Sequence, residues 1–313
     1  MNKPEVLQIG AYPEWDEVVL NELFTMHRYF EVEDKAAFLA EKAGNIRGIA
    51  TRGDLAVPGD LIAALPALEM ISVYGVGYDG VDIEACKARN IRVTNTPDVL
   101  TGDVADFAVA MMLAMTRQLV QGDHWARSGQ WLSAGMPLTH RACGKRAGIL
   151  GLGRIGTAIA KRLAAFDMEI VYSSRAPKDH ADWTYIADPV ALAEACDFLF
   201  IASAATAETR HVVNREVLEA LGPEGMVVNI SRAANIDEDA LLDALENGVI
   251  RSAALDVFEG EPALNPRFQA LDNVLLQPHQ GSGTFETRKA MADLVRENLL
   301  AHFAGEDLLT PVV

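Results

Sequence analysis

Three closely spaced glycines mark one point of this chain as the junction between a strand and a helix. Gly151, Gly153 and Gly156 follow an apolar, strand-like run and open an amphipathic helical pattern. In that context the spacing is typical of a dinucleotide-binding βαβ unit: the first glycine allows a tight turn, the second lets the backbone approach a pyrophosphate, and the third lets helix and strand pack closely. The amides of Arg154 and Ile155, at the helix start, are expected to bind the phosphates. The alternative is a structural turn without a ligand.

Short β-branched runs alternate with longer helical patterns along the whole chain, which is typical of an α/β protein with parallel sheets. Strands are predicted in two series, at residues 6–9, 48–51, 70–74 and 91–94, and then at 147–150, 169–173, 198–202, 226–230, 252–257 and 274–277. The second series predicts a Rossmann-type doubly wound sheet.

The length of 313 residues suits two domains better than one. An apolar helix at about residues 102–119 is expected to connect them. The last helix, at about residues 284–303 and ending before Gly305, is expected to fold back onto the first domain. We therefore predict a discontinuous first domain at 1–97 and 284–313, and a dinucleotide-binding Rossmann domain at 98–283.

Residue patterns within two of these helices indicate how they are built. Met111, Met112 and Met115 recur at helical spacing and are assigned to the core rather than to a ligand surface. The acidic run at residues 237–239 favours a helix start, since carboxylates stabilise the positive end of the helix dipole. Gly248 lies where a left-handed cap is expected to end that helix.

Composition excludes several classes of partner. The formal net charge of −17 argues against a general nucleic-acid or anionic-membrane surface, because phosphates are repelled at long range. No apolar run approaches the length of a membrane span, and the N-terminus has no signal-peptide pattern. Cys86, Cys143 and Cys196 lie far apart, so neither a disulfide framework nor a cysteine-type zinc site is expected, and no metal is predicted. A reducing cytoplasm is the simplest compartment.

The end of the second strand of the Rossmann series indicates which dinucleotide is bound. An NAD site usually places an acid there to bond the ribose 2′-hydroxyl, but Ser174 holds that position, 23 residues after Gly151. A hydroxyl followed by Arg175 suits a 2′-phosphate, because the hydroxyl donates and the guanidinium pairs with the dianion. We therefore predict NADPH/NADP+ as the cofactor, with NADH weaker; Lys178 is a further candidate, and the alternative is a solvated basic turn. The net negative charge of the protein does not argue against this site, because salt screens its field beyond about 8–10 Å.

Three polar residues, Arg232, Glu261 and His279, follow late strands of the second series. Such strand ends line the ligand crevice of an open α/β sheet. Each residue alone is more simply explained as a surface or loop residue. Together they supply what a 2-oxo acid reductase needs. A guanidinium holds the substrate carboxylate and polarises the ketone, an imidazolium protonates the developing oxyanion, and a carboxylate orients the imidazole and favours its charged form.

With these residues in view, essentially the whole chain resembles the D-isomer-specific 2-hydroxyacid dehydrogenases. Several motifs carry the resemblance in order: VYGVGYDGVD at 73–82, VTNTPDVLTGDVAD at 93–106, the glycine motif, NISR at 229–232, LDVFEGEP at 255–262, and PH at 278–279. Within the family, the Ser174-Arg175 pair, the TPDVLT stretch and the C-terminal LLTPVV are most similar to NADPH-dependent glyoxylate/hydroxypyruvate reductases and to hydroxyphenylpyruvate reductases.

The resemblance implies roles for individual residues. Arg232, Glu261 and His279 would be catalytic, with Arg232 and His279 also contacting substrate. The backbone at Val76 and Gly77 would bind the substrate carboxylate. Asp256 would hold the nicotinamide carboxamide, and Thr209 and Gly281 are further predicted cofactor contacts. It also implies a flavodoxin-like substrate-binding domain and a homodimer built around the nucleotide domain.

Two stretches depart from the family pattern. Ala233 and Ala234 follow Arg232 where the family commonly has glycine, so the local turn is expected to differ while the guanidinium is retained. The stretch at 202–209 lacks a proline often found there, so this cofactor-facing loop is expected to sit differently. Neither change removes a chemical group.

The predicted function is NADPH-dependent reduction of small 2-oxo acids, glyoxylate to glycolate and hydroxypyruvate to D-glycerate, with His279 as proton donor. Hydroxyphenylpyruvate and 2-ketogluconate are alternative substrates. Arg52 and Trp131 are candidates for substrate selection, although inter-domain or dimer packing explains Trp131 at least as well. The alternative from another class is an NAD(P)H-sensing binding protein without turnover.

Overall fold

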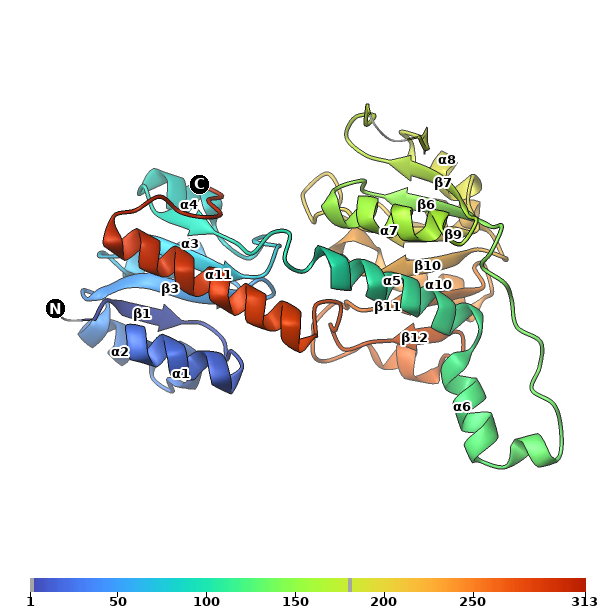
Figure 1. The fold of residues 1–313 in the computed structure, drawn as a ribbon, viewed down its shortest axis with the longest axis horizontal. Coiled ribbons are helices and arrows are strands. Elements are labelled where there is room, and N and C mark those ends of the chain that lie inside the picture. Colours follow the sequence, from blue (N-terminus) through green and yellow to red (C-terminus); the bar gives the residue numbers. More distant parts are fainter. Residues whose placement is uncertain (1–2, 180–181) are drawn as a thin grey trace. The chain divides into compact units, whose positions relative to one another are not determined.

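Two parallel β-sheets carry the fold, one in each of two units of the chain (Figure 1). The computed structural model describes residues 3–179 and 182–313. One unit comprises Met1–Leu100 and Thr284–Val313, and the other comprises Thr101–Gly283. These bounds differ from the predicted ranges only at the first boundary, which lies at Leu100 instead of residue 97. The predicted α/β class with parallel sheets is confirmed, while the functions assigned to the two ranges stay predictions.

The first unit contains a five-stranded sheet in the order β2-β1-β3-β4-β5, which is the flavodoxin-like order. Its strands are β1 (Glu5–Gln8), β2 (Thr25–Arg28), β3 (Ile46–Arg52), β4 (Met70–Tyr74) and β5 (Arg92–Thr94). Its helices are α1 (Glu14–Leu23), η1 (Tyr29–Glu31), α2 (Lys35–Lys42), α3 (Gly59–Ala64), α4 (Ile83–Ala88) and α11 (Phe285–Ala304). Strand β2 was not predicted, because this edge strand is polar and half exposed.

Helix α11 returns the chain to the first unit, where it lies along the sheet (Figure 1). The Tyr74 hydroxyl, at the end of β4, donates to the Arg288 carbonyl of α11 at 2.8 Å. Met291, Val295 and Leu299 of the helix are buried, and Leu294 is half-buried. The last helix therefore completes the core of a unit whose strands lie at the other end of the chain.

The second unit contains a seven-stranded sheet in the order β12-β11-β10-β9-β6-β7-β8. Its strands are β6 (Arg146–Leu150), β7 (Glu169–Ser173), β8 (Thr184–Tyr185), β9 (Phe198–Ile201), β10 (Met226–Asn229), β11 (Ser252–Leu255) and β12 (Val274–Leu276). Its helices are α5 (Thr101–Thr116), α6 (Leu119–Arg127), η2 (Gln130–Leu132), α7 (Arg154–Ala164), α8 (Pro189–Glu194), α9 (Arg215–Leu221), η3 (Ala233–Asn235), α10 (Glu238–Glu246) and η4 (Pro266–Ala270). The order is that of a doubly wound Rossmann sheet with β6 as its first strand, and only the short edge strand β8 was not predicted.

Helix α5 differs from the single helix predicted at 102–119. It begins with the second unit, ends at Thr116, and is followed by the separate helix α6. Gln118 between them is in the left-handed region at φ 49°, which breaks the helix. Met111, Met112 and Met115 are buried, so their assignment to the core is confirmed.

Helix α10 has the ends that the sequence indicated. The Asp237 carboxylate accepts the Ala240 amide at 3.1 Å, which caps the first turn. Gly248, just beyond the helix, is in the left-handed region at φ 64°. Within the described residues, no helix combines the length and apolar character needed to cross a membrane.

A buried acid stands out in the first unit. Asp16 of α1 is only 1% exposed, and neither of its carboxylate oxygens has a hydrogen-bond partner among the described residues. Burial raises the pKa of Asp16 to about 6, with Asp293 and Glu17 adding to the rise and Arg296 opposing it. An acid at a core position without a hydrogen-bond partner costs stability when it is ionised.

The titration of Asp16 predicts how the stability of the first unit varies with pH. The pKa is about 6 in the folded chain against an ordinary 3.8, so the cost appears as the pH rises through this window and is complete above it. We expect Asp16→Asn to raise the free energy of unfolding by about 1–3 kcal/mol at pH 8 and by less at pH 5. Urea unfolding at both pH values measures this. Glu14→Gln, an exposed acid on the same helix, is the control, and an equal pH dependence in both variants would contradict the assignment.

Candidate active site

The glycine turn after β6 has the close contacts that exclude side chains. Gly151 is at φ 102°, and a Cβ there would lie 2.5 Å from the Ser203 amide nitrogen. A Cβ on Gly156 would lie 2.0 Å from the Gly151 carbonyl oxygen. Gly153, the N-cap of α7, has open space where its Cβ would be. The turn therefore packs tightly against the sheet on one side and leaves its backbone accessible at Gly153, as a pyrophosphate-binding turn requires.

A cavity of about 800 Å³ adjoins this turn. Its lining includes Gly153 and three cationic side chains, Arg154, Lys161 and Lys178, together with Leu152, Thr157, Asp182 and Trp183. Thr157 and Lys161 were missed at the sequence level. Their spacing from Arg154, three and seven residues along α7, is the helical periodicity that places them on one face. The cavity is therefore locally cationic in an acidic protein.

The two residues predicted to select the cofactor follow the end of β7. Arg175 is exposed. The Ser174 hydroxyl donates to the Ala176 carbonyl at 2.6 Å, so it is engaged within its own turn. A hydrogen bond with Thr206 and, more weakly, the Arg175 guanidinium lower the pKa of Glu208. Arg175 therefore lies near the loop that follows β9.

That loop contains Thr209, a predicted cofactor contact. The Thr209 hydroxyl accepts the Thr206 amide at 2.8 Å and donates to the Ala204 carbonyl at 2.7 Å. In this structure the Thr209 hydroxyl therefore stabilises the loop, which closes on itself without the proline.

The three predicted catalytic residues come from loops after adjacent strands. Arg232 follows β10, Glu261 follows β11, and His279 follows β12. These strands are neighbours and parallel, so their carboxyl ends lie at one edge of the sheet. The structure thus places all three loops at the edge where ligands of doubly wound sheets bind.

His279 and Glu261 form a direct pair. Nδ1 of His279 lies 2.7 Å from Oε2 of Glu261, and both side chains are about one-third exposed, at 37% and 28%. Because a carboxylate only accepts, Nδ1 carries the proton and Nε2 is left for chemistry. His279 is also in the left-handed region at φ 55°, a conformation uncommon for a side-chain-bearing residue and frequent at functional sites.

Asp256, at the end of β11, holds the backbone around His279. Its carboxylate accepts the amides of Gln280 at 2.6 Å and Gly281 at 2.8 Å, and its carbonyl accepts the His279 amide at 3.0 Å. Burial raises the pKa of Asp256, and the two amides oppose that rise. In this structure Asp256 and Gly281 thus bind each other, a positioning contact that sequence reasoning did not anticipate.

The turn that presents Arg232 is built around Asn229. The Asn229 side chain donates to the Arg232 carbonyl at 3.1 Å and accepts the Ser231 amide at 3.0 Å. Ala233 and Ala234 continue as the 3₁₀ helix η3 without a left-handed residue, so this turn does not require the glycine that the family commonly has.

Val76 and Gly77, the predicted substrate-binding backbone, belong to the first unit, after β4. Within the described residues, their amides donate to no backbone or side-chain acceptor. The Asn95 side chain donates to the Val76 carbonyl at 2.8 Å, which fixes the turn. Arg52 in the same unit is paired with Asp54 through two contacts of 3.0 and 2.5 Å.

Comparison with known proteins identifies the family. The family model described as D-isomer specific 2-hydroxyacid dehydrogenase, NAD binding domain, matches residues 109–281. A hydroxyphenylpyruvate reductase of Plectranthus scutellarioides is 47% identical and aligns over 98% of each chain. The chain belongs to the D-isomer specific 2-hydroxyacid dehydrogenase family. It is therefore an oxidoreductase with a Rossmann NAD-binding domain.

Other members of this dehydrogenase family are similar over the full length. A glyoxylate/hydroxypyruvate reductase A of Arabidopsis thaliana is 46% identical over 98% of each chain, and a 2-ketogluconate reductase of Gluconobacter oxydans is 43% identical, covering 100% of this chain and 99% of its own. Among solved structures, a 2-hydroxyacid dehydrogenase of Ketogulonicigenium vulgare has a TM-score of 0.94 at 62% identity, covering 100% and 99% of the two chains. An NADPH-dependent glyoxylate/hydroxypyruvate reductase of Sinorhizobium meliloti, in complex with NADP and malonate, has a TM-score of 0.94 at 42% identity, covering 100% and 97%.

The residues present fit the dinucleotide that this family binds. The open backbone at Gly153 and the cationic side chains of Arg154 and Lys178 suit a pyrophosphate and its charge. The end of β7 offers Ser174 and Arg175 in place of an acid.

Proposed function

We propose that this chain is an NADPH-dependent reductase of small 2-oxo acids, which reduces glyoxylate to glycolate and hydroxypyruvate to D-glycerate. The observation that carries the proposal is the contact of 2.7 Å between His279 and Glu261. The two residues follow neighbouring strands, next to the strand that precedes Arg232, and all three lie in the unit that contains the glycine turn. A dinucleotide site together with a paired imidazole and a guanidinium is the set of groups that carbonyl reduction needs.

The reduced nicotinamide, when bound, supplies a hydride to the ketone carbon of the substrate. His279, as imidazolium, donates the Nε2 proton to the carbonyl oxygen as negative charge develops on it. Glu261 accepts the hydrogen bond from Nδ1, which leaves Nε2 as the nitrogen that donates the proton. After the transfer, the neutral ring is ready to take a proton from solvent.

The substrate carboxylate needs a cationic partner, and we propose that Arg232 supplies it. A guanidinium pairs with a carboxylate in a fixed plane and can at the same time polarise the adjacent ketone. We also propose that the amides of Val76 and Gly77 bind the carboxylate, as the family resemblance implies. Their donors are not used elsewhere within the described residues.

Preference for NADPH over NADH is proposed to rest on Arg175. Its exposed guanidinium follows β7 at the position where a 2′-phosphate is expected, and Ser174 replaces the acid that would repel it. The Ser174 hydroxyl would exchange its bond to Ala176 for the phosphate. Asp256, Thr209 and Gly281 are retained as proposed cofactor contacts.

The relatives leave three substrate types in view: glyoxylate and hydroxypyruvate, hydroxyphenylpyruvate, and 2-ketogluconate. Small 2-oxo acids are proposed first because two of the similar proteins carry glyoxylate and hydroxypyruvate in their names. The sensor alternative would bind NADPH without turning it over. A reducing compartment is proposed because the described cysteines are all free thiols.

A homodimer is proposed from apolar side chains exposed on one segment of the second unit. Figure 1 shows α6 and the chain after it extending away from the sheet. Large side chains exposed there are Leu119, Val120, Trp131, Leu132 and Leu138, with Leu132 and Leu138 95% and 98% exposed. Side chains of this size exposed in one segment favour a protein interface, and a second copy is the partner that the family resemblance implies.

The first experiment measures NADPH and NADH oxidation against glyoxylate, hydroxypyruvate, pyruvate, phenylpyruvate and 2-ketogluconate. We expect NADPH-linked turnover of the small acids, lowered by about 10²- to 10⁴-fold in His279→Ala with NADPH binding kept, since this is the usual contribution of a general acid. His27→Ala is the matched control, because His27 also pairs with a glutamate at 2.7 Å, in the first unit. Tight NADPH binding without turnover of any acid would favour the sensor, and a fully active His279→Ala would remove His279 as the acid.

The role of Arg175 gives a prediction about cofactor selection. We expect Arg175→Ala to raise the KM for NADPH by about tenfold or more and to leave the KM for NADH unchanged, because NADH has no phosphate to lose a partner. Arg215→Ala changes the net charge equally at an exposed site on α9 and serves as the control. Equal effects on both cofactors would rule out a 2′-phosphate contact.

The proposed homodimer predicts a particle of twice the chain mass of 33.9 kDa in sedimentation equilibrium. Replacing Leu132 and Leu138 together with aspartate is expected to give the single-chain mass, because burying two unpaired carboxylates at an interface is costly. Val18→Asp, at an exposed apolar position of the first unit, is expected to leave the mass unchanged. A wild-type protein of single-chain mass would contradict the dimer.

A further inference from the structure

The turn at residues 258–261 contains two neighbouring backbone amides, and each donates a hydrogen bond to a glutamate carboxylate. Glu261 itself accepts the Phe258 amide through Oε1 at 2.7 Å and contacts His279 through Oε2, also at 2.7 Å. The next amide, that of Glu259, donates to Oε2 of Glu238 at 3.0 Å. Glu238, on α10, is therefore bonded to the same short turn that presents Glu261 to His279.

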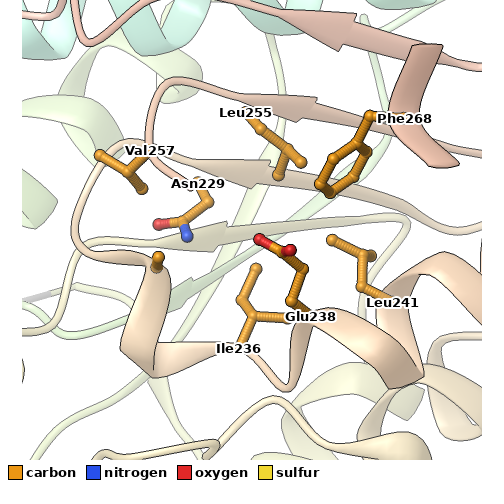
Figure 2. Close-up of a pocket in the computed structure, with 8 residues that line it drawn as sticks. Asn229, Ile236, Glu238, Leu241, Leu255, Val257 and Phe268 are labelled. Atoms are coloured by element: carbon orange, nitrogen blue, oxygen red, sulfur yellow. The ribbon is translucent and has the colours of Figure 1, made fainter. Parts of the chain in front are cut away.

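Glu238 is half-buried, with several apolar side chains around its carboxylate end. Its carboxylate points into a small cavity near the ends of β10 and β11 (Figure 2). The cavity, of about 10 Å³, is lined with Asn229 and Ala233 and with the apolar side chains of Ile236, Leu241, Leu255, Val257 and Phe268. Burial, together with the carboxylates of Glu259 and Asp239, raises the pKa of Glu238. A half-buried carboxylate among apolar side chains costs free energy when it is ionised unless hydrogen bonds compensate for it.

Helix capping does not account for this carboxylate, because Asp237 already caps α10 through the Ala240 amide. The Glu238 carboxylate instead accepts the Glu259 amide, and the nearby Asn265 side chain opposes the rise in its pKa. These two residues flank Glu261 in the sequence. The side chain of Glu259 has a different neighbour from its amide, since its carboxylate lies 3.7 Å from Nε2 of His211.

We propose that Glu238 is a positioning residue for the Glu261–His279 pair, acting by holding the turn at residues 258–261 through the Glu259 amide. The inference rests on the proposed function, in which that pair delivers the proton. The chain of contacts runs from Glu238 to the Glu259 backbone, then through Glu261 to Nδ1 of His279. Because proton transfer is sensitive to displacements of about 1 Å, a looser turn lowers the rate without removing a catalytic group.

The test compares Glu238→Ala with Glu238→Gln in the full-length protein. Alanine removes the acceptor for the Glu259 amide, whereas the glutamine side-chain carbonyl still accepts it, and both remove one negative charge. We expect Glu238→Ala to lower kcat for glyoxylate by about 10- to 100-fold with the KM for glyoxylate and the dissociation constant of NADPH unchanged. Glutamine is expected to restore most of the rate.

The pH profile of kcat/KM separates positioning from a general loss of structure. Glu261 and Asp256 are the carboxylates that act on His279. If the turn loosens and Glu261 withdraws from Nδ1, the pH limits of kcat/KM are expected to differ from the wild-type limits in Glu238→Ala, because the imidazole loses its hydrogen-bonded carboxylate. In a Glu261→Gln background, Glu238→Ala is expected to produce no further movement.

Asp239→Ala is the matched control, because it removes an exposed acid from the same turn of α10. Equal losses in Asp239→Ala and Glu238→Ala, or a Glu238→Ala profile that keeps the wild-type pH limits, would overturn the positioning role. A further shift in the Glu261→Gln background would overturn it too. Failure of the proposed function is recognised separately, since the wild-type protein would then reduce none of the 2-oxo acids.

Discussion

The common direction of β10, β11 and β12 is the constraint on which the candidate site depends. Backbone hydrogen bonds set Asn229 level with Leu255, and Leu255 level with Leu276, so the three strands end together. Whatever follows these strands must then leave the sheet at the same edge. Side-chain contacts, such as that of 2.7 Å between His279 and Glu261, then adjust residues that the strand pairing has already brought close. The loops that carry the His279 imidazole, its Glu261 partner and the Arg232 guanidinium are thus brought to one edge of the sheet by main-chain geometry.

Much of the fold and of the site follows from local sequence because the decisive signals are short. The buried strands at 70–74 and 169–173 have the predicted bounds, since each is an apolar run of β-forming residues. The glycine turn was predictable because the spacing of its glycines is a short local motif, although the contact that excludes a side chain at Gly151 is with Ser203, after β9. The polar edge strand β2 lacks the apolar alternation of an inner strand, and pairing with β1 is what makes it a strand.

What escaped prediction depends on residues distant in the chain. Gln118 ends α5 without being a glycine or a proline, so nothing local announces the break. Asp16 looks like an ordinary acid in an amphipathic helix, but it is buried, and charged residues of α11, distant in the sequence, lie close enough to shift its pKa. Glu238 reads as part of an acidic helix start, a role that its neighbour fills. Its partner amide lies 21 residues further on, beyond the reach of pattern analysis.

The return of α11 to the first unit also has a consequence for biosynthesis. On the ribosome, the strands of the first unit are made early, but the helix that covers them is made last. Even β5 obtains part of its pairing from the final residue, since the Val93 amide donates to the Val313 carbonyl at 3.2 Å. While the whole second unit is translated, the sheet of the first unit therefore has one apolar face that α11 does not yet cover. A nascent chain that lacks α11 leaves the sheet of the first unit uncovered on that face, whereas the Rossmann unit, contiguous in sequence, is already complete.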